Sequence, residues 1–150
     1  MAICAIPAYA YSLTALVRAL LGKSKKVLAL DMDNTLWGGV IGDDEVDGIA
    51  LGPETAQGAA YQEFQAYVRR LTELGVLLTV NSKNEEANAL AGLQHPHSKL
   101  HSDDFALIKA NWLPKDRNLA TTAESLNLGV DSFVFADDNP VERELVMTSL

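Results

Sequence analysis

Two clusters of acidic residues could carry chemistry, and they lie far apart in the sequence. The first is Asp31-Met32-Asp33-Asn34-Thr35, which directly follows an apolar run. A carboxylate such as Asp31 is a competent nucleophile toward phosphoryl groups. Asp33, two residues later, could donate or accept a proton at the same reaction centre. An Asx-rich turn after a strand also explains this cluster, so both interpretations stay open.

The second cluster is Asp137-Asp138-Asn139-Pro140. Asn139 as N-cap and Pro140 at the first helical position explain a helix start. Capping does not explain two successive acids at the end of an apolar strand, whereas metal ligation does. Carboxylates that converge with Asp31 in one crevice would repel each other without a cation. A hard oxygen donor set with no histidine or thiol nearby favours Mg²⁺, which in turn suits a phosphate substrate.

Ser82 and Lys115 are further candidates, each with an ordinary alternative. The run Ser82-Lys83-Asn84-Glu85 fits a capping box, which makes the Ser82 hydroxyl a helix cap, and the sequence favours this interpretation. The same hydroxyl could instead bind a phosphate oxygen. Lys115 is either a solvated lysine or the cation that steadies Asp31 and a transferred phosphate. Lys109 is the weaker candidate for that role.

Histidine and cysteine chemistry finds little support. His95, His97 and His101 are not spaced to share a helix face, and no cysteine accompanies them, so an exposed loop is a better interpretation than zinc. Cys4 is the single cysteine. One cysteine excludes a disulfide framework and a multi-cysteine metal site, and it indicates a reducing, cytoplasmic location.

The candidate residues follow apolar runs that predict strands. Runs at 27–30, 76–80 and 133–136 show no alternation, as expected for strands covered on both faces of a parallel sheet. Helical patterns separate them, so the sequence predicts an α/β, doubly wound parallel sheet. Ligands of such sheets bind beyond the carboxyl ends of the strands, where the candidate residues lie.

The remaining elements follow from periodicity and from helix-ending residues. Tyr61, Phe64, Val68 and Leu71 predict a helix stopped by Gly75. Further helices are expected over 85–93, over 118–128 with Gly129 as its end, and over 141–150. Residues 37–53 carry five glycines and four acidic residues, so we expect an exposed excursion or small flap there. Residues 95–104 read as a polar loop.

Apolar residues at 13, 16, 17, 20 and 21 share one face of an N-terminal helix, with Gly22 as its C-cap. Arg18 interrupts the apolar run and no basic region precedes it, so a membrane span or signal peptide is not expected. The amphipathic helix needs a surface to lie on. The chain ends in a helix with no strand after it, which suggests a segment of something longer.

Composition fits one globular domain. The 150 residues carry a formal charge of −8 and are 48% hydrophobic, which argues against disorder. A sequence pI of about 4.7 argues against nucleic-acid binding, which needs a basic face. We therefore expect neither nucleic acid nor membrane as a partner.

Taken together, the motifs resemble the haloacid dehalogenase (HAD) superfamily of Mg²⁺-dependent phosphotransferases. Asp31 to Thr35 match its first motif, Ser82 its second, Lys115 its third, and Asp137-Asp138 its fourth, in the expected order. The resemblance implies a HAD-type, Rossmann-like fold. Only short inserts, 36–56 and 83–111, separate the motifs, so we expect a small flap after the first strand and no large cap.

A narrower resemblance is to the FkbH-like proteins of HAD subfamily IIIC. It rests on DMDNTLWGGVIGDD, NSKNE, NWLPKDRNL and FVFADDNPVERE, and it runs from about residue 25 to the C-terminus. It implies that residues 1–24 are the tail of a preceding domain. It also implies that the catalytic domain, 25–150, lacks a C-terminal strand.

The resemblance implies a role for each motif residue. Asp31 would attack phosphorus and form an aspartyl phosphate, while Asp33 would protonate the leaving group and then deprotonate water. Ser82 and Lys115 would hold the phosphoryl oxygens. The implied Mg²⁺ ligands are Asp31, Asp33 through its backbone carbonyl, Asp137 and Asp138. We also expect substrate contacts from the residues beside these motifs, Asn34, Thr35, Lys83 and Asn84.

Three functions therefore compete. The first is a phosphohydrolase or phosphotransferase acting on a phosphorylated small molecule or a carrier-borne group. The second, implied by the FkbH resemblance, dephosphorylates a three-carbon acid and loads the glyceryl group onto an acyl carrier protein in polyketide or other secondary metabolism. That transfer is thought to need a protein thiol, and Met32 and Asn81 stand where relatives carry cysteine. The third is a non-catalytic scaffold, which would have no need of Asp33.

Overall fold

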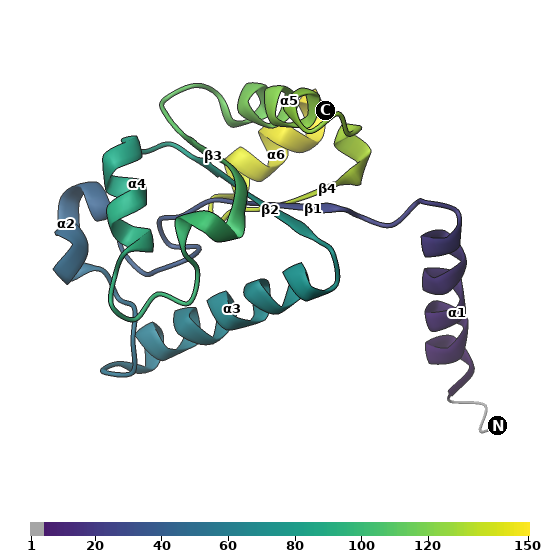
Figure 1. Ribbon diagram of the computed structural model, residues 1–150, viewed down its shortest axis with the longest axis horizontal. Coiled ribbons are helices and arrows are strands. Elements are labelled where there is room, and N and C mark those ends of the chain that lie inside the picture. The colour runs from purple at the N-terminus through teal and green to yellow at the C-terminus, as the bar shows by residue number, and fades with distance from the viewer. Residues whose placement is uncertain (1–4) are drawn as a thin grey trace.

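The computed structural model describes residues 5–150, so Cys4 lies outside the described residues. Four parallel strands form one sheet in the order β3-β2-β1-β4 (Figure 1). The strands are β1 (Val27–Leu30), β2 (Leu77–Ser82), β3 (Phe105–Ala110) and β4 (Phe133–Ala136). The helices are α1 (Ile6–Leu20), α2 (Ile41–Gly48), α3 (Ala56–Glu73), α4 (Glu86–Leu93), α5 (Lys115–Ser125) and α6 (Pro140–Ser149), with short 3₁₀ turns at Ser102–Asp104 and Val130–Ser132.

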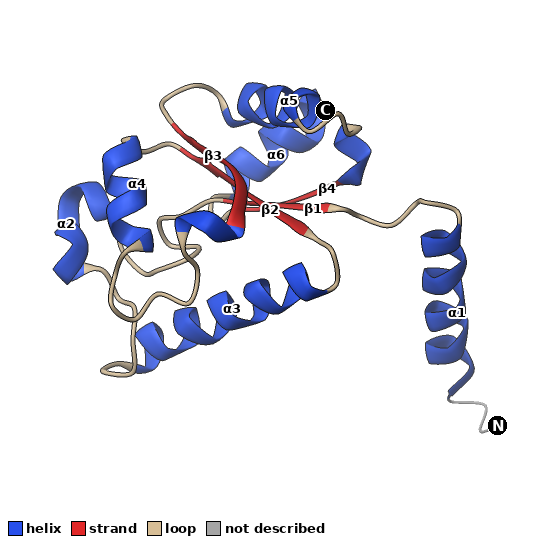
Figure 2. Ribbon diagram, viewed as in Figure 1, coloured by secondary structure: helices blue, strands red, loops and turns tan. Residues whose placement is uncertain are grey.

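Helices cover both faces of the sheet, which confirms the predicted doubly wound α/β fold (Figure 2). On one face, Val68 of α3 packs with β-strand residues such as Leu30 and Val80. On the other face, Leu119 of α5 and Val146 of α6 belong to a second cluster that includes β1 and β4 residues. Burial on both faces explains the uninterrupted apolar runs of the central strands.

β3 is the strand that the sequence analysis did not predict. It lies at the edge of the sheet, next to β2 alone. Only Phe105 at its start is buried, and Lys109 interrupts its apolar residues. An edge strand does not need the continuous apolar run by which the other strands were recognised.

Two helix ends show what the local sequence can determine. α3 ends before Gly75, which has the predicted helix-stopping role with φ of +83°. α5 ends earlier than expected, at Ser125, and the residue with positive φ is Asn127 (+53°). Gly129 was the wrong choice, because asparagine can also adopt the left-handed conformation that ends a helix.

Residues 37–53 are not the exposed excursion that their glycines and acids predicted. Trp37, Ile41, Ile49 and Leu51 are all buried in the core cluster. Backbone hydrogen bonds in both directions between Gly38 and Ala50 close the segment at its base. The flap is therefore small, as expected, but it packs against the domain, with α2 beside α4 (Figure 1).

α1 stands apart from the sheet, connected by a short segment (Figure 1). Gly22, with φ of +68°, ends it as predicted. None of its residues is buried, and Leu13, Leu16 and Leu20 on the predicted apolar face are exposed. Within residues 5–150, no helix combines the length and apolarity needed to cross a bilayer.

Gln65 provides a test of how the chain just before the flap is fixed to the domain. Its side chain is fully buried, donates to the Leu36 carbonyl and accepts from Ser98, Lys99 and Leu100. Because a similar-sized apolar side chain would leave these groups unpaired, Gln65→Leu should lower the free energy of unfolding by about 3 kcal/mol.

Urea denaturation measures this loss. The matched control is Gln94→Leu at an exposed position, which should change stability by no more than about 0.5 kcal/mol. Equal unfolding midpoints for the two variants would contradict the structural role of Gln65.

Candidate functional site

Strand register brings the two acidic clusters together. Leu30, the last residue of β1, is paired with Ala136, the last residue of β4. An aspartate directly follows each of these strands. The Asp31 amide donates a hydrogen bond to the Ala136 carbonyl at 2.9 Å. Asp31 and Asp137 therefore lie side by side although 106 positions separate them in the chain.

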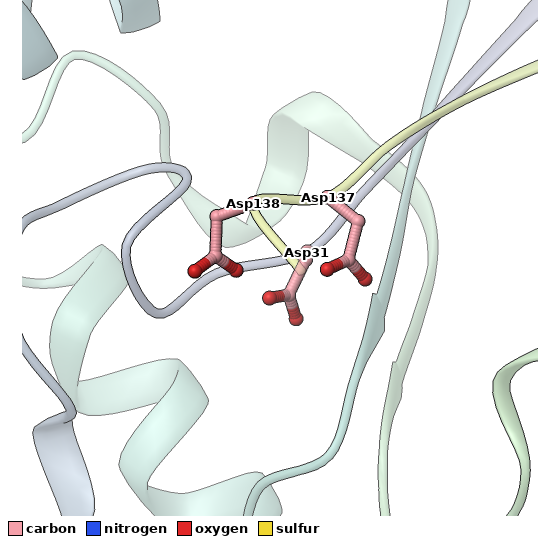
Figure 3. Close-up of side chains that lie close together, drawn as sticks. All are labelled: Asp31, Asp137 and Asp138. Carbon is pink, nitrogen blue, oxygen red and sulfur yellow. The ribbon is translucent and has the colours of Figure 1, made fainter. Parts of the chain in front are cut away.

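Three carboxylates form the centre of the site. Asp31, Asp137 and Asp138 each offer an oxygen, and these oxygens lie within 4.8 Å of one another. Figure 3 shows the three side chains pointing the same way from the ends of β1 and β4. Asp31 and Asp137 are 6% and 7% exposed, while Asp138 reaches solvent. A set of hard oxygen donors in this arrangement is suited to a divalent cation.

Lys115 supplies the positive charge that these acids need. Its Nζ lies 2.9 Å from Asp31 Oδ1 and 2.5 Å from Asp137 Oδ2, and the residue is only 3% exposed. Burial by itself lowers the pKa of Lys115, but the two carboxylates outweigh it and hold that pKa above its ordinary value. The lysine is therefore a charged bridge and not the solvated residue of the alternative interpretation.

Burial and the neighbouring polar groups shift the pKa of Asp31 in opposite directions. Burial raises the pKa of the Asp31 carboxyl above its ordinary value, and the charge of Lys115 and the hydroxyl of Ser82 only partly offset this. Negative charge at Asp31 is thus costly in the protein alone. An additional cation would favour the charged carboxylate.

Asn81 is a buried residue that supports the site, and the sequence analysis gave it no such role. It follows Val80, which is the β2 partner of Leu30. Asn81 therefore lies beside Asp31 at the carboxyl ends of the strands. Its Nδ2 donates to the Lys115 carbonyl at 2.9 Å and fixes the start of α5. Strand register was the signal that could have identified it.

Ser82 is the last residue of β2 and is 1% exposed. The predicted capping box was wrong, because α4 begins only at Glu86 and its N-cap, Glu85, makes no side-chain capping bond. Asn84 instead accepts a hydrogen bond from the Glu85 amide. The Ser82 hydroxyl is therefore not used as a helix cap.

The second cluster is anchored by the helix that follows it. Asn139 is the N-cap of α6, as predicted, and accepts from the Val141 amide. Arg143, which the sequence analysis did not single out, donates to the carbonyls of Asp137 and Asp138. These two hydrogen bonds from α6 hold the backbone that carries both aspartates.

These residues enclose a pocket of about 190 Å³. Its lining contains all six residues predicted to be catalytic or to bind metal, which are Asp31, Asp33, Ser82, Lys115, Asp137 and Asp138. Asn34, Lys83, Asn139 and Glu142 complete the lining. A second pocket of about 500 Å³ adjoins it through Asn34, Asp137 and Asp138, and α3 contributes Tyr61 and Phe64.

The four residues expected to contact substrate already have protein partners. Asn34 accepts from the Gly39 amide and Thr35 from the Asp138 amide. Lys83 pairs with Glu142, and Asn84 donates to Asp33. Substrate binding by these residues stays a prediction.

The other candidates lie outside this pocket. Lys109 donates to Thr121 and does not reach Asp31. His97 pairs with Glu54 at 3.0 Å, and neither His97 nor His95 is among the pocket residues.

Removing the charge of Lys115 should destabilise the protein. Lys115→Met leaves Asp31 and Asp137 buried without a positively charged partner, so the free energy of unfolding should fall by about 3–5 kcal/mol in the absence of divalent cations. Chemical denaturation in a chelator measures it, and Lys109→Met is the control. A loss no larger than that of Lys109→Met would show that Lys115 does not compensate the two acids.

Comparison with known proteins adds one informative match. No family model matches the chain, and no curated protein matches it. A solved structure does: the N-terminal part of the protein BF1531 from Bacteroides fragilis, containing a phosphatase domain and complexed with Mg. The two share 42% identity with a TM-score of 0.90. The match covers 96% of this chain and 39% of the other, so this chain spans well under half of the length of that crystallised chain.

Proposed function

We propose that this chain is a Mg²⁺-dependent phosphohydrolase of the HAD type that works through an aspartyl phosphate on Asp31. The observation that carries the proposal is the bridge from Lys115 to Asp31 and Asp137, with Asp138 in the same cluster. A nucleophilic carboxylate, a cation beside it and a set of metal ligands meet at one point. The similarity to a phosphatase domain complexed with Mg supports the same reaction.

The donor set fits the proposed ion. Asp31, Asp137 and Asp138 offer only carboxylate oxygens, which Mg²⁺ prefers. We propose these three as ligands, with the backbone carbonyl of Asp33 as a fourth. When bound, Mg²⁺ would neutralise negative charge on the phosphoryl group during transfer.

Four side chains of this chain then carry out the phosphoryl transfer and the hydrolysis. Asp31 attacks phosphorus, while the Lys115 ammonium and the Ser82 hydroxyl hold phosphoryl oxygens. Asp33 gives a proton to the leaving oxygen. In the second half it takes a proton from the water that hydrolyses the aspartyl phosphate, releasing phosphate.

Hydrolysis is better supported than glyceryl transfer to an acyl carrier protein. The described site offers no thiol, because Met32 and Asn81 occupy the two positions where the FkbH resemblance would place a cysteine. Both residues are buried. The adjoining pocket of about 500 Å³ is compatible with a carrier-borne phosphate, but no contact among the described residues favours a carrier. A mass shift on an acyl carrier protein incubated with a phosphorylated three-carbon acid would support the transfer. A non-catalytic scaffold would show no turnover of any phosphate ester.

Asp31→Asn tests the nucleophile. The amide is nearly the same size but cannot form the aspartyl phosphate, so hydrolysis of p-nitrophenyl phosphate should be abolished while the circular dichroism spectrum is retained. Asp131→Asn, at an exposed position, is the matched control and should keep full activity. Comparable turnover by Asp31→Asn and the wild type would rule out the proposed intermediate.

Thermal unfolding tests the metal site without any substrate. Mg²⁺ at 100 times its Kd should stabilise the protein by about 2.7 kcal/mol, which raises the Tm of a chain of this size by about 8 °C. Asp137→Asn should remove most of that shift, because it weakens the carboxylate set. A wild-type Tm that is indifferent to millimolar Mg²⁺ would contradict the site.

A further inference from the structure

The carboxylate of Asp33 is held by three N–H donors, two from the flap at residues 37–53 and one from the loop after β2. The indole Nε1 of Trp37 and the amide of Ile41 both donate to Oδ1, at 2.9 and 3.1 Å. Nδ2 of Asn84, which follows β2, donates to Oδ2 at 3.0 Å. A residue needed only for a turn would not require this network.

The arrangement distinguishes the two oxygens of Asp33. A carboxylate has about four acceptor positions, two on each oxygen. The N–H groups of Trp37 and Ile41 occupy both positions on Oδ1. Asn84 occupies one on Oδ2, and its amide orientation is fixed because its own Oδ1 accepts from the Glu85 amide. One acceptor position is therefore left, and it belongs to Oδ2.

Trp37 is itself held rigidly. It is fully buried, and its ring lies directly against Gly92 of α4. A Cβ added at Gly92 would lie 2.5 Å from Trp37 Cη2, so glycine is what lets the indole reach its place. Simple core packing would explain a buried tryptophan, but it would not explain an N–H aimed at the side chain of a proposed catalytic acid.

We propose that Trp37 is a positioning residue for phosphoryl transfer, and that together with Asn84 it makes Oδ2 of Asp33 the oxygen that moves the proton. This inference rests on the proposed function and deepens it. As Asp31 forms a bond to phosphorus, the bond from phosphorus to the leaving oxygen breaks and its electron pair stays on that oxygen. The proton of Asp33 Oδ2 passes to the same oxygen, and the alcohol departs.

The consequence is a dependence on the leaving group. A p-nitrophenolate leaves without protonation, whereas an alkoxide needs a proton, so a misplaced Asp33 should harm alkyl phosphates far more than aryl phosphates. The relevant quantity is kcat/KM, because it covers only the steps up to departure of the first product. A general acid accelerates a reaction by about 10²–10⁴-fold. A partly misplaced Asp33 should therefore lower kcat/KM for alkyl phosphates by a substantial part of that factor.

The kinetic experiment compares kcat/KM for an alkyl phosphate and for p-nitrophenyl phosphate. Trp37→Phe keeps an aromatic ring but loses the N–H, and the alkyl-to-aryl ratio should fall about tenfold or more. Asn84→Ala and Gly92→Ala should lower the same ratio, the latter from a distance by displacing the indole. Gly42→Ala is the matched control, since its Cβ would meet only Asn88 Nδ2 at 3.7 Å, and it should leave the ratio unchanged.

A second measurement needs no turnover. The chain has two tryptophans, and Trp112 donates to Glu85, so two indole N–H signals are expected by NMR. Asp33→Ala should shift the Trp37 signal and leave the Trp112 signal in place, while Glu85→Gln should do the reverse.

The outcomes separate the two proposals. A shifted Trp37 signal with a lowered alkyl-to-aryl ratio supports the positioning role. An unmoved Trp37 signal, or equal losses on both substrates in Trp37→Phe, overturns it while the phosphatase stands. If the wild type hydrolyses neither substrate, the proposed function fails, and the positioning role fails with it even where the NMR contact is present.

Discussion

Like charges gathered at the ends of neighbouring parallel strands are the constraint on which this structure depends. The pairing of β1 with β4 places Asp31 and Asp137 next to each other and away from water, where two carboxylates repel strongly. Lys115 offsets that repulsion from the start of α5. The negative charge that remains, with Asp138 beside it, is what a divalent cation would neutralise. A costly arrangement in the protein alone is therefore an arrangement prepared for a ligand.

The polar network around the acids is understood best as support for that arrangement. Asn81 fixes the backbone of Lys115, and Arg143 holds the carbonyls of the second acidic cluster. The flap contributes through Trp37, and Gln65 ties Leu36, the residue just before the flap, to the loop at residues 98–100. Segments that the sequence indicated as mere connections thus hold the side chains of the proposed active site in place, as a preorganised site requires.

Much of the fold and of the site could be predicted from the sequence. Uninterrupted apolar runs identified the two central strands and β4, and the residues directly after them proved to lie in one pocket. β3 was not predicted, because an edge strand has a weaker apolar pattern than a central strand. The local pattern favoured a helix cap over a phosphate contact for Ser82, because a local motif gives no information on where a strand stops. Asn81, Arg143 and the contact of Trp37 with Asp33 depend on register and on packing between distant segments, which spacing in the chain does not reveal.

A crystal structure of the protein with Mg²⁺ and beryllium fluoride tests the central claim most directly. Beryllium fluoride imitates a phosphoryl group on a carboxylate. The account predicts beryllium bonded to a carboxylate oxygen of Asp31, fluorides near Lys115 and Ser82, and the metal ion among Asp31, Asp137 and Asp138. A fluoride complex on another residue, or a metal ion bound away from these three aspartates, would contradict it.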